Sequence, residues 1–224
     1  MKKILFYSFI LYTLMNIITG YNLNSQEIQP QDQLYEEALK YEREKKWDKA
    51  LELYKRYLAI VSNPIDQVRG KTSLAYVYAY KGEYSQALKI LDDIITEYAP
   101  EKYPHTHFAA DAQFSKAVIF QNIIGDYKKA IDEYQKMIEK FPNDWRVKES
   151  PICLYKIGAC YRQLKNYDKA IIIYQKIIND FPSTDWEKVS RLNMELVEEY
   201  EKKGIEISPD VIKQKAKEKG INEM

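Results

Sequence analysis

One stretch of the chain, residues 154–182, sets the strongest limit on the fold because its plan returns three more times upstream. It reads LYKIGACYRQLKNYDKAIIIYQKIINDFP, with two runs of apolar residues joined by a short polar turn. Apolar residues spaced by three and four positions lie on one face of a helix. The stretch therefore predicts two amphipathic helices folded back on each other as a hairpin.

The copies are found by an alanine that follows an aromatic residue by three positions in each of them. The alanines are Ala50, Ala87, Ala130 and Ala170, at intervals of 37, 43 and 40 residues. The aromatic residues are Trp47, Tyr84, Tyr127 and Tyr167. A helical hairpin of this size cannot bury its own apolar face, so neighbouring hairpins must stack to form a core.

This pattern resembles the tetratricopeptide repeat (TPR). In the last copy the matching positions are Leu154, Ile157, Gly158, Tyr161, Tyr167, Ala170, Tyr174 and Pro182. The resemblance implies an all-α fold, a right-handed helical-hairpin solenoid of about four units and a C-terminal capping helix. We expect units at 32–64, 66–100, 107–142 and 147–182, with the cap at 185–203. The intervals exceed the 34 residues of the consensus, and the surplus falls in the linkers between units.

Small residues predict where the two helices of each hairpin approach most closely. On the second helices these are the four alanines, and twelve positions earlier on the first helices stand Ala38, Ala75, Val118 and Gly158. Gly82 is expected to end its helix in a left-handed conformation, which glycine adopts without steric cost.

The two ends of the chain differ from the repeats. Residues 1–25 begin with Lys2 and Lys3 and continue with an apolar run, which is typical of a secretory signal peptide. No cysteine follows the run, so a lipid-modified N-terminus is excluded. An uncleaved membrane anchor is the alternative, and residues 26–31 form a polar linker. Residues 204–224 form a charged tail whose short helix, around 209–219, is expected to dock only loosely.

Composition and motifs exclude several classes of function. The net charge of +1 gives no support to nucleic-acid binding, which needs a basic surface. We find no motif of a nucleotide-binding, metalloprotease or hydrolase site, so the prediction is no enzyme, no catalytic residues and no cofactor. His105, His107 and Asp111 could supply three zinc ligands, but a solvated loop explains them better, and no metal is predicted.

The two cysteines are expected to be free. Cys153 and Cys160 would lie about 10.5 Å apart along one helix, at about 1.5 Å per residue. A disulfide needs Cα atoms within roughly 7 Å. Burial at a helix contact is favoured over a redox sensor or an intermolecular bridge.

The resemblance also implies a binding site. In the family, the first helices of successive hairpins line a concave groove that binds a partner segment. Carried over by position, the lining consists of Tyr35, Leu39, Glu42, Arg69, Thr72, Tyr76, Tyr80, Ser115, Ile119, Asn122, Tyr155, Arg162 and Gln163. Tyr and Arg often anchor interfaces. Packing between helices is the alternative role for the tyrosines. The Lys/Asn clamp of cytosolic chaperone-binding members is absent.

The phrase YxKAIxxYQKxIxxFP resembles exported TPR proteins of the bacterial cell envelope, of the cell-division coordinator and outer-membrane assembly lipoprotein types. It implies a non-catalytic adaptor of the periplasm or cell envelope that binds protein partners. Membrane association through the N-terminal segment is the expectation if that segment is an uncleaved anchor. The alternative is a polysaccharide- or peptidoglycan-binding export subunit that stacks sugars on its tyrosines. The sequence does not indicate an oligomeric state.

Overall fold

The computed structural model describes residues 30–104, 106–203 and 208–221, and this part of the chain is helical. The long helices are α2 (Pro30–Arg43), α3 (Trp47–Ile60), α4 (Pro64–Tyr80), α5 (Tyr84–Glu97), α6 (Phe108–Ile119), α7 (Tyr127–Lys140), α9 (Ile152–Gln163), α10 (Tyr167–Asp180), α11 (Asp185–Lys203) and α12 (Pro209–Glu218). A π-helical turn, η2 (Phe120–Ile124), extends α6, and a short helix, α8 (Trp145–Lys148), lies in the linker before α9. The predicted signal peptide or anchor lies outside the described residues.

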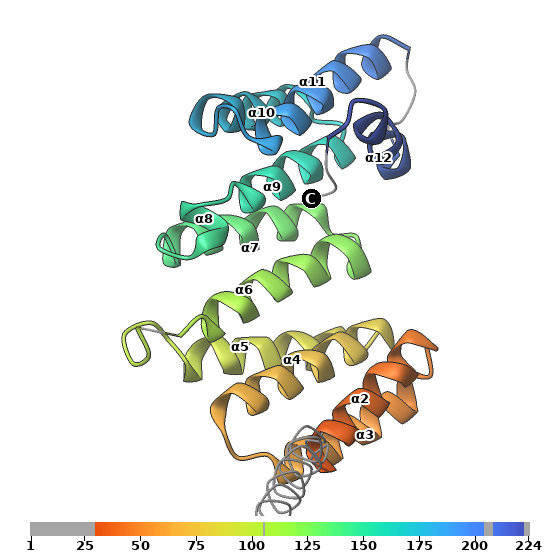
Figure 1. Ribbon diagram of the computed structural model, residues 1–224, viewed down its shortest axis with the longest axis vertical. Coiled ribbons are helices and arrows are strands. Elements are labelled where there is room, and N and C mark those ends of the chain that lie inside the picture. The colour runs from red at the N-terminus through yellow and green to blue at the C-terminus, as the bar shows by residue number, and fades with distance from the viewer. Residues whose placement is uncertain (1–29, 105, 204–207, 222–224) are drawn as a thin grey trace, which may run out of the picture.

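The helices form a stack of antiparallel hairpins, as the sequence predicts. The pairs are α2–α3, α4–α5, α6–α7 and α9–α10, and each pair packs on the next through α3–α4, α5–α6 and α7–α9. Helix α11 packs on α10 as a further layer. Figure 1 shows the layers following one another along the long axis, from α2 and α3 at one end to α11 at the other. The fold is therefore an all-α solenoid of helical hairpins.

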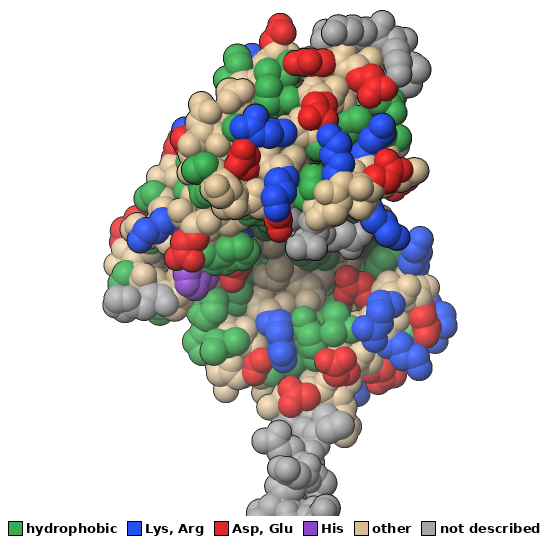
Figure 2. Space-filling view, turned by 45° about the horizontal axis from the view of Figure 1, so that its top comes forward, with side chains coloured by type: hydrophobic (Ala, Val, Ile, Leu, Met, Phe, Trp, Pro, Cys, Tyr) green, Lys and Arg blue, Asp and Glu red, His purple; other side chains and the backbone are tan. Residues whose placement is uncertain are grey.

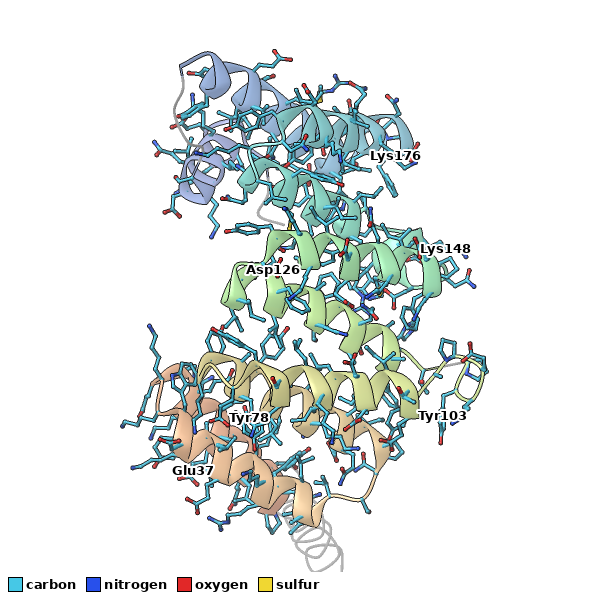
Figure 3. All side chains as sticks on the ribbon, turned by 180° about the vertical axis from the view of Figure 1, so that it is seen from behind. Glu37, Tyr78, Tyr103, Asp126, Lys148 and Lys176 are labelled. Carbon is cyan, nitrogen blue, oxygen red and sulfur yellow. The ribbon has the colours of Figure 1, made fainter. Side chains whose placement is uncertain are left out.

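All of the predicted small residues except Val118 are buried where the paired helices touch. Ala50, Ala87, Ala130 and Ala170 are each fully buried. Gly158 shows why the facing position must also be small, because a Cβ atom there would lie 2.8 Å from the ring of Tyr174. That distance is well below van der Waals contact. Figure 3 shows side chains filling the space between the ribbons.

The turn inside each hairpin ends on a left-handed residue. Gly82 (φ 82°) and Gly125 (φ 77°) occupy this position in the second and third hairpins. Lys45 (φ 56°) and Lys165 (φ 57°) occupy it in the first and fourth. The left-handed region costs a non-glycine residue roughly 1–2 kcal/mol, so these two lysines are held there by the hairpin.

The third hairpin departs from the predicted register because of η2. Ala117, rather than Val118, is fully buried, whereas Val118 is only half-buried. A π turn inserts one extra residue into a helix, so the small residue stands thirteen positions before Ala130 instead of twelve. The prediction that Val118 makes the close contact is wrong, and every position before the π turn shifts by one.

The C-terminal tail docks more firmly than the sequence suggests. Ile212 and Ile221 are 6% and 7% exposed, and they share an apolar cluster with Leu192, Leu196 and Val197 of α11. The expectation of loose docking is wrong, because these two isoleucines pack against α11. The expectation rested on the many charged residues of the tail, which surround the two isoleucines in the sequence.

Two further findings concern the start of α2 and the hydrophobicity of the helices. Helix α2 begins at Pro30, so the last residues of the predicted linker belong to the helix. Among the helices of the described residues, none is long and apolar enough to cross a membrane.

Candidate partner-binding groove

The first helix, α2, lays an aromatic residue against the next hairpin. Tyr35 is half-buried between Tyr54 and Tyr57, with ring centroids 5.5 and 5.1 Å away, and its hydroxyl lies 2.9 Å from Ser73 Oγ. The Arg69 guanidinium lies over the Tyr35 ring at 4.2 Å. Two predicted site residues from different hairpins therefore touch, in the cation–π arrangement.

Arg69 is exposed, and contacts with residues of α2, α3 and α4 hold its guanidinium in place. It donates a hydrogen bond of 2.8 Å to the Tyr57 hydroxyl and pairs with Asp66 at 3.1 Å and with Asp32 at 3.8 Å. Burial alone would lower the pKa of Arg69, but the hydrogen bond with Tyr57 and the charge of Asp66 more than offset burial and raise that pKa. Arg69 thus presents a fixed positive charge at this end of the groove.

Glu42, another predicted site residue, holds a buried tyrosine in place. It accepts a hydrogen bond of 2.8 Å from Tyr54 Oη, and Tyr54 is fully buried. Burial and then this glutamate raise the pKa of Tyr54, so the phenol stays protonated and remains a donor. Leu39 and Thr72 are half-buried beside this region.

Tyr76 and Tyr80, both on α4, form the most accessible aromatic part of the groove. Tyr80 is 49% exposed, and its ring stacks on Trp47 at 4.8 Å with an angle of 6° between the planes. Tyr76 is half-buried near Ser115 of α6, and burial raises its pKa, although the serine hydroxyl opposes the shift. Trp47 was predicted only as the aromatic position of the repeat, and its contact with Tyr80 adds it to the site.

In the third hairpin the predicted lining is mostly wrong. Ser115 and Ile119 are 8% and 0% exposed, so they pack inside, and of the three only Asn122 is exposed. The π turn is the reason, because it shifts the preceding helix by one residue. Phe114 and Val118 take the two vacated positions and, like Gln121 beside Asn122, are half-buried.

Contacts to the second helix confirm this equivalence. Phe114 packs edge-on against Tyr134 at 5.7 Å, and Gln121 accepts a hydrogen bond of 2.8 Å from the Tyr134 hydroxyl. The Tyr35–Tyr54–Glu42 group makes the same contacts in the first hairpin. One sign of this shift was present in the sequence. Ala117 is smaller than its neighbour Val118, and the helix contact requires a small side chain.

In the fourth hairpin the predicted residues face the cap instead of an open surface. Tyr155 packs against Tyr174 at 6.0 Å and against Trp186 of α11 at 5.6 Å, and Asn193 donates a 3.4 Å bond to its hydroxyl. Arg162 is only 7% exposed, and Gln163 is half-buried. Of the two roles left open for the tyrosines, Tyr155 therefore takes packing.

The accessible groove thus belongs to the first three hairpins, and α11 and α12 close its C-terminal end. Figure 2 shows the molecule hollowed across its middle, with hydrophobic side chains next to charged ones around the hollow. Among the groove side chains of these three hairpins, those that are exposed or half-buried include Tyr35, Arg69, Tyr76, Tyr80, Phe114, Val118 and Asn122.

His107 and Asp111, for which zinc binding was the less favoured interpretation, contact protein groups. His107 Nδ1 lies 3.1 Å from Asp144 Oδ2, and Asp111 pairs with Arg146 at 2.7 Å. His105 lies outside the described residues. Within the described ranges, no three His, Cys, Asp or Glu side chains are grouped as a metal site would require.

Both cysteines are free and buried on α9. Burial raises the pKa of each thiol to about 12. Because the thiolate is the reactive form of cysteine, neither is activated for nucleophilic or redox chemistry at neutral pH.

Comparison with known proteins places this architecture. No curated protein matches the chain at a significant level. Among solved structures, a putative kinesin light chain from Podosopora anserina with nearly identical TPR-like repeats is similar with a TM-score of 0.56, at 14% identity, over 77% of this chain and 86% of that one. This likeness confirms the TPR-like fold.

Two further structures give weaker matches. A tetratricopeptide repeat protein from Parabacteroides merdae has a TM-score of 0.46 at 19% identity, over 75% of this chain and 63% of that one. MamA from the AMB-1 strain has a TM-score of 0.39 at 21% identity, over 72% of this chain and 78% of that one. The family model described as soluble NSF attachment protein, SNAP, matches residues 20–194. That match spans most of the chain and all four hairpins, and the protein belongs to the SNAP family of TPR-like helical proteins.

Proposed function

We propose that this protein is a non-catalytic scaffold that binds a segment of a protein partner in the groove of its first three hairpins. The observation that carries the proposal is the Trp47–Tyr80 stack, whose tyrosine is 49% exposed beside Tyr76 and Glu42. Aromatic residues on a rigid support cost little conformational entropy to bind and are enriched at the centres of interfaces.

The family and the fold support a protein partner. TPR-like solenoids present extended concave surfaces for partner segments, and the family description names an attachment protein. No particular partner follows from that name.

We further propose that the protein acts in the bacterial cell envelope, after export directed by residues 1–25. The support is the sequence of that segment, with its two lysines and apolar run. Fractionation of cells that carry the tagged chain tests this point, because a cytoplasmic fraction holding all of the protein would contradict it.

The experiment on the groove is crosslinking in intact cells followed by mass spectrometry, with the wild-type chain and a Tyr80→Ala variant. Truncating an aromatic anchor costs about 2 kcal/mol of binding, so we expect a roughly 30-fold weaker affinity for the crosslinked partner once it is purified. Tyr103→Ala is the matched control, because Tyr103 is 43% exposed on the loop that follows α5 (Figure 3), whereas Tyr80 lies at the turn before α5.

Circular dichroism of each variant shows whether the helices remain folded. Equal recovery of partners by the wild-type chain and Tyr80→Ala would contradict the groove. Retention on peptidoglycan or polysaccharide, lost in Tyr80→Ala and kept in Tyr103→Ala, would instead favour the sugar-binding alternative.

A further inference from the structure

Glu42 carries a half-buried negative charge that no described residue neutralises. Its carboxylate accepts a hydrogen bond of 2.8 Å from the Tyr54 hydroxyl, which is a neutral group. Within the described part of the chain, no lysine, arginine or histidine forms an ion pair with it. Acidic side chains that are withdrawn from water are ordinarily paired, so the charge of Glu42 requires an explanation.

The repeat shows that the bond to the tyrosine does not need this charge. In the third hairpin the equivalent tyrosine, Tyr134, donates to Gln121 at the same distance of 2.8 Å. Gln121 makes the contact that Glu42 makes in the first hairpin, and it is half-buried as well. A neutral amide oxygen therefore fills the structural role, and the negative charge of Glu42 is left over.

Neighbouring charged side chains are engaged with one another. Asp48, the chain neighbour of Trp47, pairs with Lys81 at 2.6 Å. Across the groove, Arg69 pairs with Asp66 at 3.1 Å. Neither pair involves Glu42, so its carboxylate is available to a cation that a ligand brings.

Aromatic rings lie beside this carboxylate. Tyr80 is 49% exposed and stacks on Trp47 at 4.8 Å. Tyr76 stands one helical turn before Tyr80, and burial, followed by the charges of Tyr80 and Glu42, raises the pKa of Tyr76. The carboxylate is therefore close to the Tyr76 ring. The acid and the three rings come from three helices, α2, α3 and α4.

A carboxylate beside accessible aromatic rings favours an organic cation as the ligand. The faces of Trp and Tyr rings attract ammonium and guanidinium groups, and Trp attracts them most strongly. A carboxylate forms charge-assisted hydrogen bonds with the same groups. An acidic ligand would be repelled by Glu42, and an apolar one would leave the carboxylate unpaired.

We propose that this end of the groove is a cation-binding site that receives a lysine or arginine side chain of the protein partner. The site consists of Glu42, Trp47, Tyr76 and Tyr80. The inference rests on the proposed function, which supplies the partner, and it specifies the chemistry of one position in the bound segment. Lysine and arginine both carry a charge at the end of an apolar stem, so the stem can lie along the rings while the charged group reaches the carboxylate.

The binding test uses the purified full chain and small probes, without any partner. N-acetyl-lysine amide and N-acetyl-arginine amide each offer one cation, and N-acetyl-norleucine amide offers the lysine stem without its charge. We expect a cationic probe to shift the indole N–H resonance of Trp47 with saturation in roughly the millimolar range. The norleucine probe should leave that resonance unchanged, and the indole signals of Trp145 and Trp186 serve as internal references.

The variant Glu42→Gln separates the charge from the structural bond. Because Gln121 accepts the same bond from Tyr134, we expect the thermal midpoint of this variant to stay within about 2 °C of the wild-type value. Its affinity for the cationic probes should fall roughly tenfold or more. Glu37→Gln is the matched control, because it removes the same charge from an exposed position of the same helix (Figure 3) and should bind like the wild-type chain.

Three outcomes would overturn the proposal. Equal binding of the lysine and norleucine probes, or binding of neither cationic probe, would show that the site does not take a cation. Binding that survives Glu42→Gln would place the probe elsewhere. A midpoint of Glu42→Gln far below the wild-type value would show that the charge itself holds Tyr54.

The probes also keep this inference separate from the groove as a whole. Partner binding that is lost in Tyr80→Ala, together with no binding of either cationic probe, would leave the proposed function standing and remove only the cation site. If a cationic probe binds and the more tightly bound one is the lysine or the arginine derivative, that preference identifies the side chain of the partner.

Discussion

At the scale of single residues, Asp144 shows how one carboxylate joins two hairpins. It is 4% exposed, and it accepts bonds from Arg146 Nε at 2.7 Å, Arg146 Nη2 at 2.9 Å and His107 Nδ1 at 3.1 Å. Burial alone would raise the pKa of Asp144, but the bonds from Arg146 outweigh it and hold that pKa below its ordinary value of 3.8. The linker before α9 is therefore fixed by charge.

We predict that Asp144→Asn lowers the free energy of unfolding by about 3 kcal/mol at neutral pH, the low end for breaking a buried pair, because Asp111 still pairs with Arg146. A group with a depressed folded-state pKa stabilises the protein above its unfolded pKa and loses this effect as the pH falls through the folded value. The difference between the two chains should therefore persist down to about pH 5 and narrow below 3.8. Urea unfolding at several pH values measures it.

The matched control is Asp111→Asn, since the Asp111 side chain is 50% exposed. Pairs at the surface contribute about 0–1 kcal/mol, so this change should have little effect. A pH-independent difference for Asp144→Asn would show that the carboxylate acts through shape rather than charge.

The sequence predicts the role of a residue where side-chain size or backbone conformation determines the residue type. It does not predict that role where the residue depends on its contact with a partner residue. Gly82 was predicted as a left-handed residue because glycine favours that conformation. Lys45 and Lys165 take the same conformation without any local signal. The Asp144–Arg146 pair also lacks one, since charged neighbours in a linker are ordinarily solvated.

At the scale of elements, the π turn η2 decides which side chains of α6 face the groove. The repeat predicts a spacing of twelve residues between the small positions, which selects Val118. The fold places Ala117 there, fully buried. A π turn depends on the backbone bonds available between packed helices, and the sequence gives no direct sign of it. Two of the predicted groove residues, Ser115 and Ile119, are misplaced for this single reason.

We predict that Ala117→Val destabilises the protein by about 1–3 kcal/mol, the cost of adding methyl groups to a packed core. Val118→Ala should cost less than about 1 kcal/mol, because Val118 is half-buried. Chemical denaturation of both variants gives the comparison. A helix without the π turn would bury Val118 and predicts the reverse order of the two effects. A larger loss of stability for Val118→Ala than for Ala117→Val would therefore contradict the π turn.

At the scale of the whole molecule, the groove is accessible along the first three hairpins, and α11 and α12 close it at the fourth. The order of the hairpins and their contacts could be predicted because the same pattern of residues recurs in all four of them. The closure could not, because it depends on Ile212 and Ile221 in a tail whose composition is charged. The groove is consequently shorter than the repeat count implies, and Tyr155 contributes to packing.

Repeat proteins are stabilised by contacts between neighbours, so damage at one end should remain local. We predict that Ile212→Ala, which truncates a side chain that is 6% exposed, costs about 2–5 kcal/mol in the C-terminal layer. Amide hydrogen exchange should rise in α11 and α12 and remain unchanged in α2 and α3, whose core is a separate cluster around Ala38, Ala50 and Tyr54. Lys213→Ala, at an exposed position beside Ile212, is the control and should leave both regions unchanged. An equal rise of exchange in all hairpins would show that the solenoid unfolds as one cooperative unit, and the closed end would then stabilise the distant groove as well.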